Sequence, residues 1–340
     1  MNPASTTNNS ASPLELHRRT ATLRRAAVRA TLAASIHNTQ PWRFELSPGQ
    51  LEVFSDSSRQ LRVLDPTGRQ LILSCGCALF NARVSLAAAG MAAAVTRWPD
   101  PTRPDLLARL TVSEQVAGRV DPIGALDAVI EQRHTNRRRF SDDLVPAELI
   151  DALQQAATAE GSELFVVGGE DDRLAVARLS QKADEIQNAN PAYRAELRAW
   201  TTVDPSRSDG VPANAVPRVN GTAQDEVPVR DFDTAGAGQL PPATHSSRNQ
   251  CLLLLGTAAD RDPDWLRAGE ALERILLEIT RHGFVASPLT QLVEVPFTRV
   301  AARNELRLGM HPHVLLRVGR APLTPATRRR RLVDLLGERS

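Results

Sequence analysis

The chain has 340 residues, of which 42% are apolar and 24% charged, a composition typical of a globular protein with a substantial core. Its net charge is only +2, so overall charge points to neither a nucleic acid nor a membrane surface as a partner. The three cysteines do not suggest a secreted disulfide scaffold, and we interpret them as small buried thiols. Lys182 is the only lysine, so any anion site must be built from arginine.

The N-terminal region lacks the pattern of an export signal. Arg18 and Arg19 are followed by Arg24, Arg25 and Arg29 rather than by an apolar run. The longest apolar stretch, 85–95, is too short to cross a bilayer. We therefore expect a cytoplasmic protein without a membrane partner.

Apolar periodicity and turn residues predict five segments in the first part of the chain. They are a disordered start at 1–13, a helix at 14–33, a two-stranded turn at 42–54, a helix at 68–89 and a strand at 107–112. Gly90 follows the second helix directly, as a glycine often does at a helix end.

The second part is predicted to contain more helix. Its expected helices are 121–133, 146–159, 171–188 and 263–282, and its expected strands are 163–167, 251–255 and 314–318. The segment 201–245 is rich in proline and glycine and has no sustained apolar period. Loops of this length are uncommon unless they act as lids or are disordered, so a lid and a mobile surface loop both remain open.

The two long apolar helices share a pattern. The residues Gly76, Ala78, Leu79 and Gly90 have the same spacing as Gly269, Ala271, Leu272 and Gly283. Similar strands follow, at 108–112 and 315–319. We interpret this as an internal duplication, with a first half at 14–120 and a second half at 121–340.

Two polar segments carry the candidate chemistry. Residues 133–139 hold four arginines with Thr135 and Asn136, and guanidinium groups with a hydroxyl can bind a phosphate. The alternatives are a solvated basic loop or a nucleic-acid contact. Residues 34–44 form a short polar loop between a helix and a strand, and the alternative there is an ordinary turn with Trp42 in the core.

Together these segments resemble the nitroreductase superfamily. The first is similar to its loop Pro-Ser-x-x-Asn-x-Gln-Pro-Trp-x-Phe, and the matching residues are Ser35, Asn38, Gln40, Pro41, Trp42 and Phe44. The second is similar to its phosphate motif Arg-Arg-Ser-x-Arg at Arg133, Thr135 and Arg137. Ala34 and His134 depart from the two patterns. The resemblance covers about residues 20–325 and is to the Acg-type branch, whose members are fused single chains.

This resemblance implies an α+β, nitroreductase-like fold with two half-copies fused into a pseudo-dimer, and antiparallel-rich central sheets flanked by helices. In ordinary members the arginine motif precedes the Gln-Pro-Trp loop, whereas here it follows. The two motifs therefore lie in different halves and can meet at one flavin across the internal interface. A second site would need an arginine motif in the first half and a Gln-Pro-Trp loop in the second, and neither is evident, so one FMN per chain is expected. The fused chain is also expected to be a monomer.

The resemblance also implies roles for individual residues. The FMN phosphate would be held by Arg133, Thr135 and Arg137, with Asn136 nearby and Arg329 or Arg331 as a further contact, unless the basic tail is only solvated. The isoalloxazine would be flanked by Ser35, Ile36 and Asn38, with Gln40 behind them. From the other half it would be approached by Pro288, Leu289, Thr290 and Gln291.

The expected function is an oxidoreductase that passes electrons from NAD(P)H through FMN to a nitroaromatic, a quinone or a similar small molecule. The cofactor supplies this chemistry, so no catalytic side chain is required. The alternative is a protein that holds or sequesters FMN behind a closed lid without turnover. Other classes have less support. The pair His311 and His313 has no third metal ligand, no Gly-x-Ser-x-Gly elbow occurs, and the arginine clusters lack interleaved aromatic residues.

Overall fold

The computed structural model describes residues 13–114, 121–204, 206–216, 227–232, 250–322, 324 and 326–337. The expected disordered start therefore lies outside the described residues, apart from Pro13, which begins the first helix. Of the predicted lid or loop 201–245, residues 205, 217–226 and 233–245 also lie outside them.

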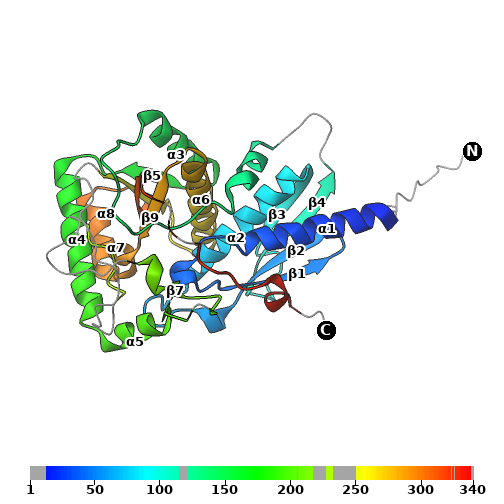
Figure 1. The fold of residues 1–340 in the computed structure, drawn as a ribbon, viewed down its shortest axis with the longest axis horizontal. Helices are drawn as coiled ribbons and strands as arrows, with labels where there is room; N and C mark the ends of the chain where they lie inside the picture. The colour runs from blue at the N-terminus through cyan, green and yellow to red at the C-terminus, as the bar shows by residue number, and fades with distance from the viewer. Residues whose placement is uncertain are drawn as a thin grey trace, which may run out of the picture.

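The first half contains one four-stranded antiparallel sheet with the order β1-β2-β4-β3 (Figure 1). Its elements are α1 (Pro13–Ala30), η1 (Ile36–Asn38), β1 (Trp42–Ser47), β2 (Gln50–Ser55), η2 (Ser57–Arg59), α2 (Arg69–Ala88), β3 (Met91–Arg97) and β4 (Leu106–Glu114). The hairpin of β1 and β2 pairs Ser47 with Gln50, which confirms the two-stranded turn predicted at 42–54.

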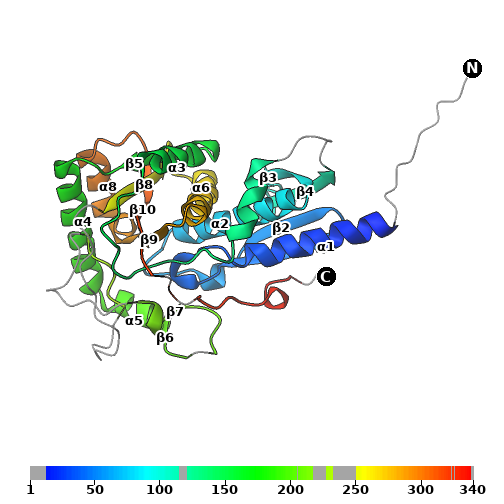
Figure 2. The ribbon, with the colours of Figure 1, turned by 45° about the horizontal axis from the view of Figure 1, so that its top comes forward.

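The second half contains another four-stranded antiparallel sheet, with the order β5-β8-β10-β9. Its helices are η3 (Pro122–Val129), α3 (Ala147–Ala159), α4 (Glu170–Asn188), α5 (Pro191–Ala199), η4 (Ala213–Ala215), α6 (Asp262–Arg281), α7 (Gln291–Glu294), α8 (Pro296–Glu305) and η5 (Leu332–Asp334). Its strands are β5 (Glu163–Val166), β6 (Thr201–Thr202), β7 (Val211–Pro212), β8 (Cys251–Thr257), β9 (Val285–Leu289) and β10 (His311–Gly319). Figure 2 shows α4 and α5 at the end of the molecule opposite α1.

The two halves repeat one topology. Replacing β1, β2, β4 and β3 by β5, β8, β10 and β9 gives the same strand order, and α2 and α6 hold equivalent places. These two helices pack on each other where the halves meet (Figure 1). A Cβ on Gly76 would lie 2.1 Å from the carbonyl oxygen of Leu266, and one on Gly269 would lie 2.0 Å from that of Leu73. Such reciprocal contacts are typical of a twofold interface, and the repeated order confirms the predicted duplication.

The helix α2 is buried on nearly its whole circumference because α1, η3 and α6 all pack against it. It is long and apolar enough to cross a membrane, but 89% of its apolar window is buried inside the protein, as expected of a core helix. Cys75 and Cys77 lie in this helix as buried thiols, and Cys251 at the start of β8 is partly buried.

Two segments are attached to elements far from them in the sequence. Asn136 N donates to Ala286 O over 2.9 Å, which attaches the arginine segment to β9. The C-terminal segment 326–337 returns to the first sheet, where Phe44 N donates to Leu335 O over 2.8 Å (Figure 2). The division at 120/121 remains a prediction, and by contact this tail joins the first sheet.

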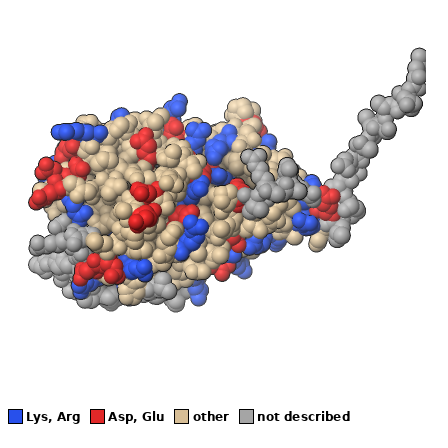
Figure 3. All heavy atoms as spheres, turned by 90° about the horizontal axis from the view of Figure 1, so that it is seen from above, with Lys and Arg blue, Asp and Glu red and all other residues tan. Residues whose placement is uncertain are grey.

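Several elements differ from the expectation. The segment 121–133 forms the 3-10 helix η3, which ends at Val129, rather than one longer helix. The strands β3 and β9 were not predicted, because β3 is rich in alanine and β9 contains a proline, and both are poor strand formers. They form because neighbouring strands pair with them: β4 pairs with β3, and β10 pairs with β9. Acidic and basic side chains are interspersed over the face shown in Figure 3, in keeping with the small net charge.

Candidate functional site

A pocket lies between the two halves, with about 730 Å³ of empty space that includes open solvent at its mouth. The first half lines it with Ala34, Ser35, Ile36, His37, Gln70, Leu73, Ser74 and Cys77. The second half lines it with Thr135, Arg137, Val229, Arg230, Phe232, Leu272, Ser287, Pro288, Leu289, Thr290, Gln291 and Val314.

The pocket brings together residues from both predicted motifs. Those that line it are Ser35, Ile36, Thr135, Arg137, Pro288, Leu289, Thr290 and Gln291. The remaining predicted site residues are not among its lining residues, namely Asn38, Gln40, Arg133, Asn136 and Arg329. The structure therefore places the two motifs in one site and puts part of each behind the pocket wall.

The loop 35–41 has an unusual backbone. His37, Asn38 and Gln40 have φ values of 45°, 55° and 49°, in the left-handed region that residues other than glycine seldom adopt. Gln40 holds this shape, because its backbone N–H donates to Ser35 Oγ over 3.1 Å and its Oε1 accepts from Arg330 N over 2.8 Å. Gln40 is fully buried and is not among the residues that line the pocket.

Asn38 and Asn136 use their side-chain amides on backbone groups. Asn38 Nδ2 donates to Gly210 O over 3.0 Å and to Arg328 O over 3.1 Å. Asn136 Nδ2 donates to Pro322 O over 2.8 Å, and its Oδ1 accepts from Arg138 N over 3.0 Å. Both amides therefore shape loops around the pocket in this structure.

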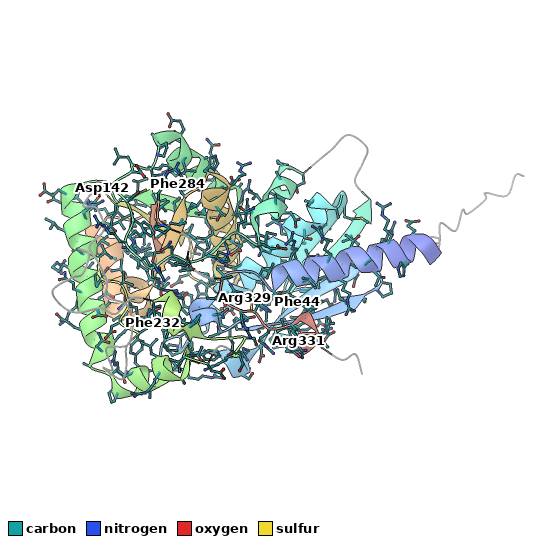
Figure 4. The ribbon with its side chains drawn as sticks, viewed as in Figure 1. Phe44, Asp142, Phe232, Phe284, Arg329 and Arg331 are labelled. Atoms are coloured by element: carbon teal, nitrogen blue, oxygen red, sulfur yellow. The ribbon has the colours of Figure 1, made fainter. Side chains whose placement is uncertain are left out.

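Behind Ala34 lies a buried cluster of two guanidinium groups and one carboxylate. Arg133 Nε is 3.3 Å from Glu273 Oε1, Ala34 N donates to Glu273 Oε2 over 3.1 Å, and Arg329 Nη2 donates to Ala33 O over 3.3 Å. Within the described part of the chain, the Nε atoms of Arg133 and Arg329 are buried without a hydrogen-bond partner. Figure 4 shows Arg329 near the middle of the molecule and Arg331 farther along the tail.

This cluster favours an anion. Burial and the neighbouring Arg133 lower the pKa of Arg329 to about 9, and burial raises the pKa of Glu273 although Arg133 opposes this. Burial together with Arg133 and Arg329 also lowers the pKa of His134. Two guanidinium groups facing one carboxylate leave a positive excess with unused donors, which is suited to a phosphate.

Two further arginines lie at the opposite wall. Arg137 lies over the ring of Phe232, 5.4 Å from its centroid, and burial, followed by the nearby Arg230, lowers the pKa of Arg137 to about 10. Arg230 makes a buried ion pair with both oxygens of Glu294 at 2.7 Å. Burial alone would lower the pKa of Arg230, but Glu294 and Tyr193 raise it above the ordinary value.

Sequence reasoning missed several lining residues, and among them are His37, Gln70, Arg230, Phe232 and Ser287. Neither ring nitrogen of His37 has a hydrogen-bond partner among the described residues, and the same holds for Gln70 Nε2 and Ser287 Oγ. Unsatisfied buried polar atoms around a pocket are what a ligand with polar edges would satisfy. Among the missed residues, only His37 could have been marked in advance, by its position between the matched motif residues Ser35 and Asn38.

The equivalent place in the other half is filled. When Gly76 and Gly90 are matched with Gly269 and Gly283, the lining residue Cys77 corresponds to Glu270, and Thr290 corresponds to Arg97. The Glu270 side chain is fully buried, its oxygens accept from Arg83 over 2.8 Å and from Arg97 over 2.7 Å, and Arg83 also bonds Glu160 over 2.6 Å. An ion-pair network therefore occupies the position that mirrors the pocket.

Replacing Glu270 with glutamine should destabilise the protein by about 2 kcal/mol, because two guanidinium groups lose their shared buried carboxylate. The value is below the roughly 3–5 kcal/mol for breaking a buried pair, since Arg83 keeps Glu160 and the Arg97 side chain is 27% exposed. Urea unfolding measures the change. The matched control is Glu305→Gln, which removes the surface pair with Arg178 and should cost less than about 1 kcal/mol. Equal costs for the two variants would contradict a buried network.

Comparison with known proteins relates the whole chain to a set of mycobacterial proteins. A Mycobacterium tuberculosis protein named "Putative NAD(P)H nitroreductase" is 38% identical over 320 residues, which cover 93% of this chain and 91% of the relative. Another from the same species, "Putative NAD(P)H nitroreductase acg", is 31% identical over 92% of this chain and 94% of its own length. No family model matches the chain.

Among solved structures, the FMN-dependent nitroreductase NfnB from Mycobacterium smegmatis in complex with NADPH is 18% identical, and the match covers 59% of this chain and 89% of that one. Its TM-score is 0.34, too low to carry an argument about the site. The sequence relationship is the decisive one. Identity of 38% over more than nine-tenths of both chains shows that this chain belongs to the nitroreductase superfamily, in the branch that contains the Acg protein.

Proposed function

We propose that the protein is an FMN-dependent oxidoreductase that takes electrons from NAD(P)H and passes them to a nitroaromatic, a quinone or a similar small acceptor. The observation that carries the proposal is the joining of a pocket with unsatisfied polar atoms to a buried, positively charged arginine cluster. FMN has a flat ring with polar edges and a phosphate, so it matches both parts. The relatives named NAD(P)H nitroreductases support the same activity.

Each part of the site has a task in this proposal. Arg133 and Arg329 bind the phosphate, Arg329 through its unused Nε donor, and Thr135 lines the pocket. The segments 35–36 and 288–291 enclose the ring from opposite halves and exclude water from it. Bound FMN supplies the hydride chemistry, and the protein supplies binding and electrostatics.

We also propose one FMN per chain. The network around Glu270 supports this, because charged side chains fill the position equivalent to the pocket. Phe80 is the residue equivalent to Glu273, so the mirror position also lacks the polar group that faces Arg133. Because the fused chain supplies its own internal interface, we propose that it acts as a monomer.

One observation favours the alternative, in which the protein holds FMN without turnover. Val229, Arg230 and Phe232 form part of the pocket wall, and the buried pair of Arg230 with Glu294 fastens this segment to α7. If the wall stays closed over the ring, nicotinamide cannot reach it.

A visible spectrum of the purified protein, followed by anaerobic addition of NADPH and then NADH, tests the proposal. We expect a flavin spectrum that bleaches with at least one nicotinamide, and a phosphorus and absorbance assay that gives one FMN per chain. Bound flavin that bleaches with neither nicotinamide would establish the alternative. Protein that contains no flavin and binds none from added FMN would contradict both.

A further inference from the structure

His37 is a buried histidine in the pocket wall for which the matched family loop assigns no role, because it occupies an unspecified position of that loop. The residue is 5% exposed. Within the described residues, both of its ring nitrogens are buried and lack a hydrogen-bond partner. His313, which is also buried, contrasts with it, because its Nε2 lies 2.6 Å from Thr257 Oγ1.

The fold holds His37 in this position at an energetic cost. A φ of 45° and ψ of 27° place it in the left-handed region, which costs on the order of 1–3 kcal/mol for a residue other than glycine. Each buried polar atom without a partner adds a cost of similar size. Such a combination persists where a ligand uses the group.

The surroundings of His37 define the chemistry of its ligand. The ring of Phe232 lies edge-on to the imidazole, with centroids 5.6 Å apart and an interplanar angle of 67°. Burial, then Arg230 and Arg137, lower the pKa of His37 well below its ordinary value, so the ring is neutral and offers one N–H donor and one acceptor nitrogen. Leu73, Val229 and Leu289 add apolar wall to the same pocket.

We propose that His37 recognises the electron acceptor, with its imidazole N–H donating a hydrogen bond to a carbonyl oxygen of a flat, uncharged quinone. This inference rests on the proposed function and names the acceptor class of the same site. A neutral donor between apolar and aromatic walls suits an uncharged ring that carries oxygen at its edge.

The neighbouring charges favour the reduction of such a ligand. Hydride addition to a quinone leaves a hydroquinone anion, which becomes the hydroquinone when its oxygen takes a proton from water. Arg137 and Arg230, the two guanidinium groups that disfavour protonation of His37, stabilise negative charge on an oxygen bound there. His37 is thus an acceptor-binding residue and transfers no group itself.

The test uses full-length protein loaded with FMN and menadione as the quinone. Calorimetry on the oxidised protein gives the menadione Kd, and steady-state assays with NADPH or NADH give KM and kcat. His37→Gly accepts a positive φ without strain and removes the imidazole, so we expect Kd and KM to rise about tenfold while the FMN Kd stays within twofold. His37→Asn keeps a donor and tolerates the same backbone, so its Kd should stay within about threefold of the original.

The matched control is His313→Gln, which changes a buried histidine outside the pocket and should leave the menadione Kd unchanged. An unchanged menadione Kd in His37→Gly would overturn the proposal. Weakened FMN binding with unchanged menadione binding would also overturn it, because His37 would then contact the flavin. Menadione that fails to bind the unsubstituted holoprotein would overturn it as well. Failure of the proposed function appears separately, as bound flavin that neither nicotinamide bleaches, while the calorimetric Kd of the oxidised FMN-loaded protein still reports on His37.

Discussion

Replacing Gly269 with alanine is expected to destabilise the protein by about 3 kcal/mol or more, although alanine is the better helix former by about 1 kcal/mol. The added Cβ would lie 2.0 Å from Leu73 O and 2.9 Å from the Cα of Gly76. Both are backbone atoms of α2, so no side-chain rotation relieves the overlap and the helices must separate. Urea unfolding followed by far-ultraviolet circular dichroism measures the loss.

The repeated topology sharpens this prediction. Gly76→Ala introduces the equivalent overlap from the other helix, 2.1 Å from Leu266 O, so its cost should be similar. The double variant should lose less than the sum of the two, because one separation of the helices relieves both overlaps. Gly309→Ala is the matched control, since nothing lies within 4 Å of its Cβ position, and it should leave stability within about 0.5 kcal/mol. Additive costs for Gly76 and Gly269 would show that the two glycines do not share one contact.

The sequence predicts the elements that local patterns determine better than those that depend on long-range pairing. The helices α2 and α6 were predicted almost to their ends, because the apolar run of α2 and the periodic apolar face of α6 are followed by Gly90 and Gly283, both of which have positive φ. The strands β3 and β9 were missed because their own residues have little preference for strand structure. They are strands because they pair with β4 and β10. Local patterns therefore defined the helices, and long-range pairing defined these strands.

The same distinction applies to the site. Ser35 and Thr135 were found because they belong to short motifs, and the structure places both at one pocket. Phe232 and Arg230 come from a segment whose sequence has no period, so only the folded chain shows that they reach this wall. Nor could the sequence show that Glu270 and its ion pairs fill the position equivalent to the pocket, because its partners Arg83 and Arg97 lie far away in the sequence. Motifs identify residues that bind a shared ligand, whereas they say little about the walls that select a particular one.

Arg329→Met is expected to weaken FMN binding by about 30- to 100-fold while riboflavin binding changes by less than about twofold. The guanidinium group has a buried Nε without a partner and shares its surroundings with Arg133, so it is available to a phosphate, which riboflavin lacks. A charge-assisted hydrogen bond to a phosphate contributes about 1.5–3 kcal/mol, which corresponds to a loss of about 10- to 150-fold and so contains the expected value. Fluorescence titration of the apoprotein with each flavin measures both constants.

Arg331→Met is the matched control on the same tail. The Arg331 side chain is 79% exposed and pairs with Asp334, so its loss should leave both affinities within about twofold. Arg329 also donates to Ala33 O and therefore helps to hold the tail against the pocket loop. An equal loss of FMN and riboflavin binding would mean that Arg329 acts only through that contact. A loss confined to FMN requires that the phosphate itself be bound at this cluster, which would locate the cofactor between the two halves.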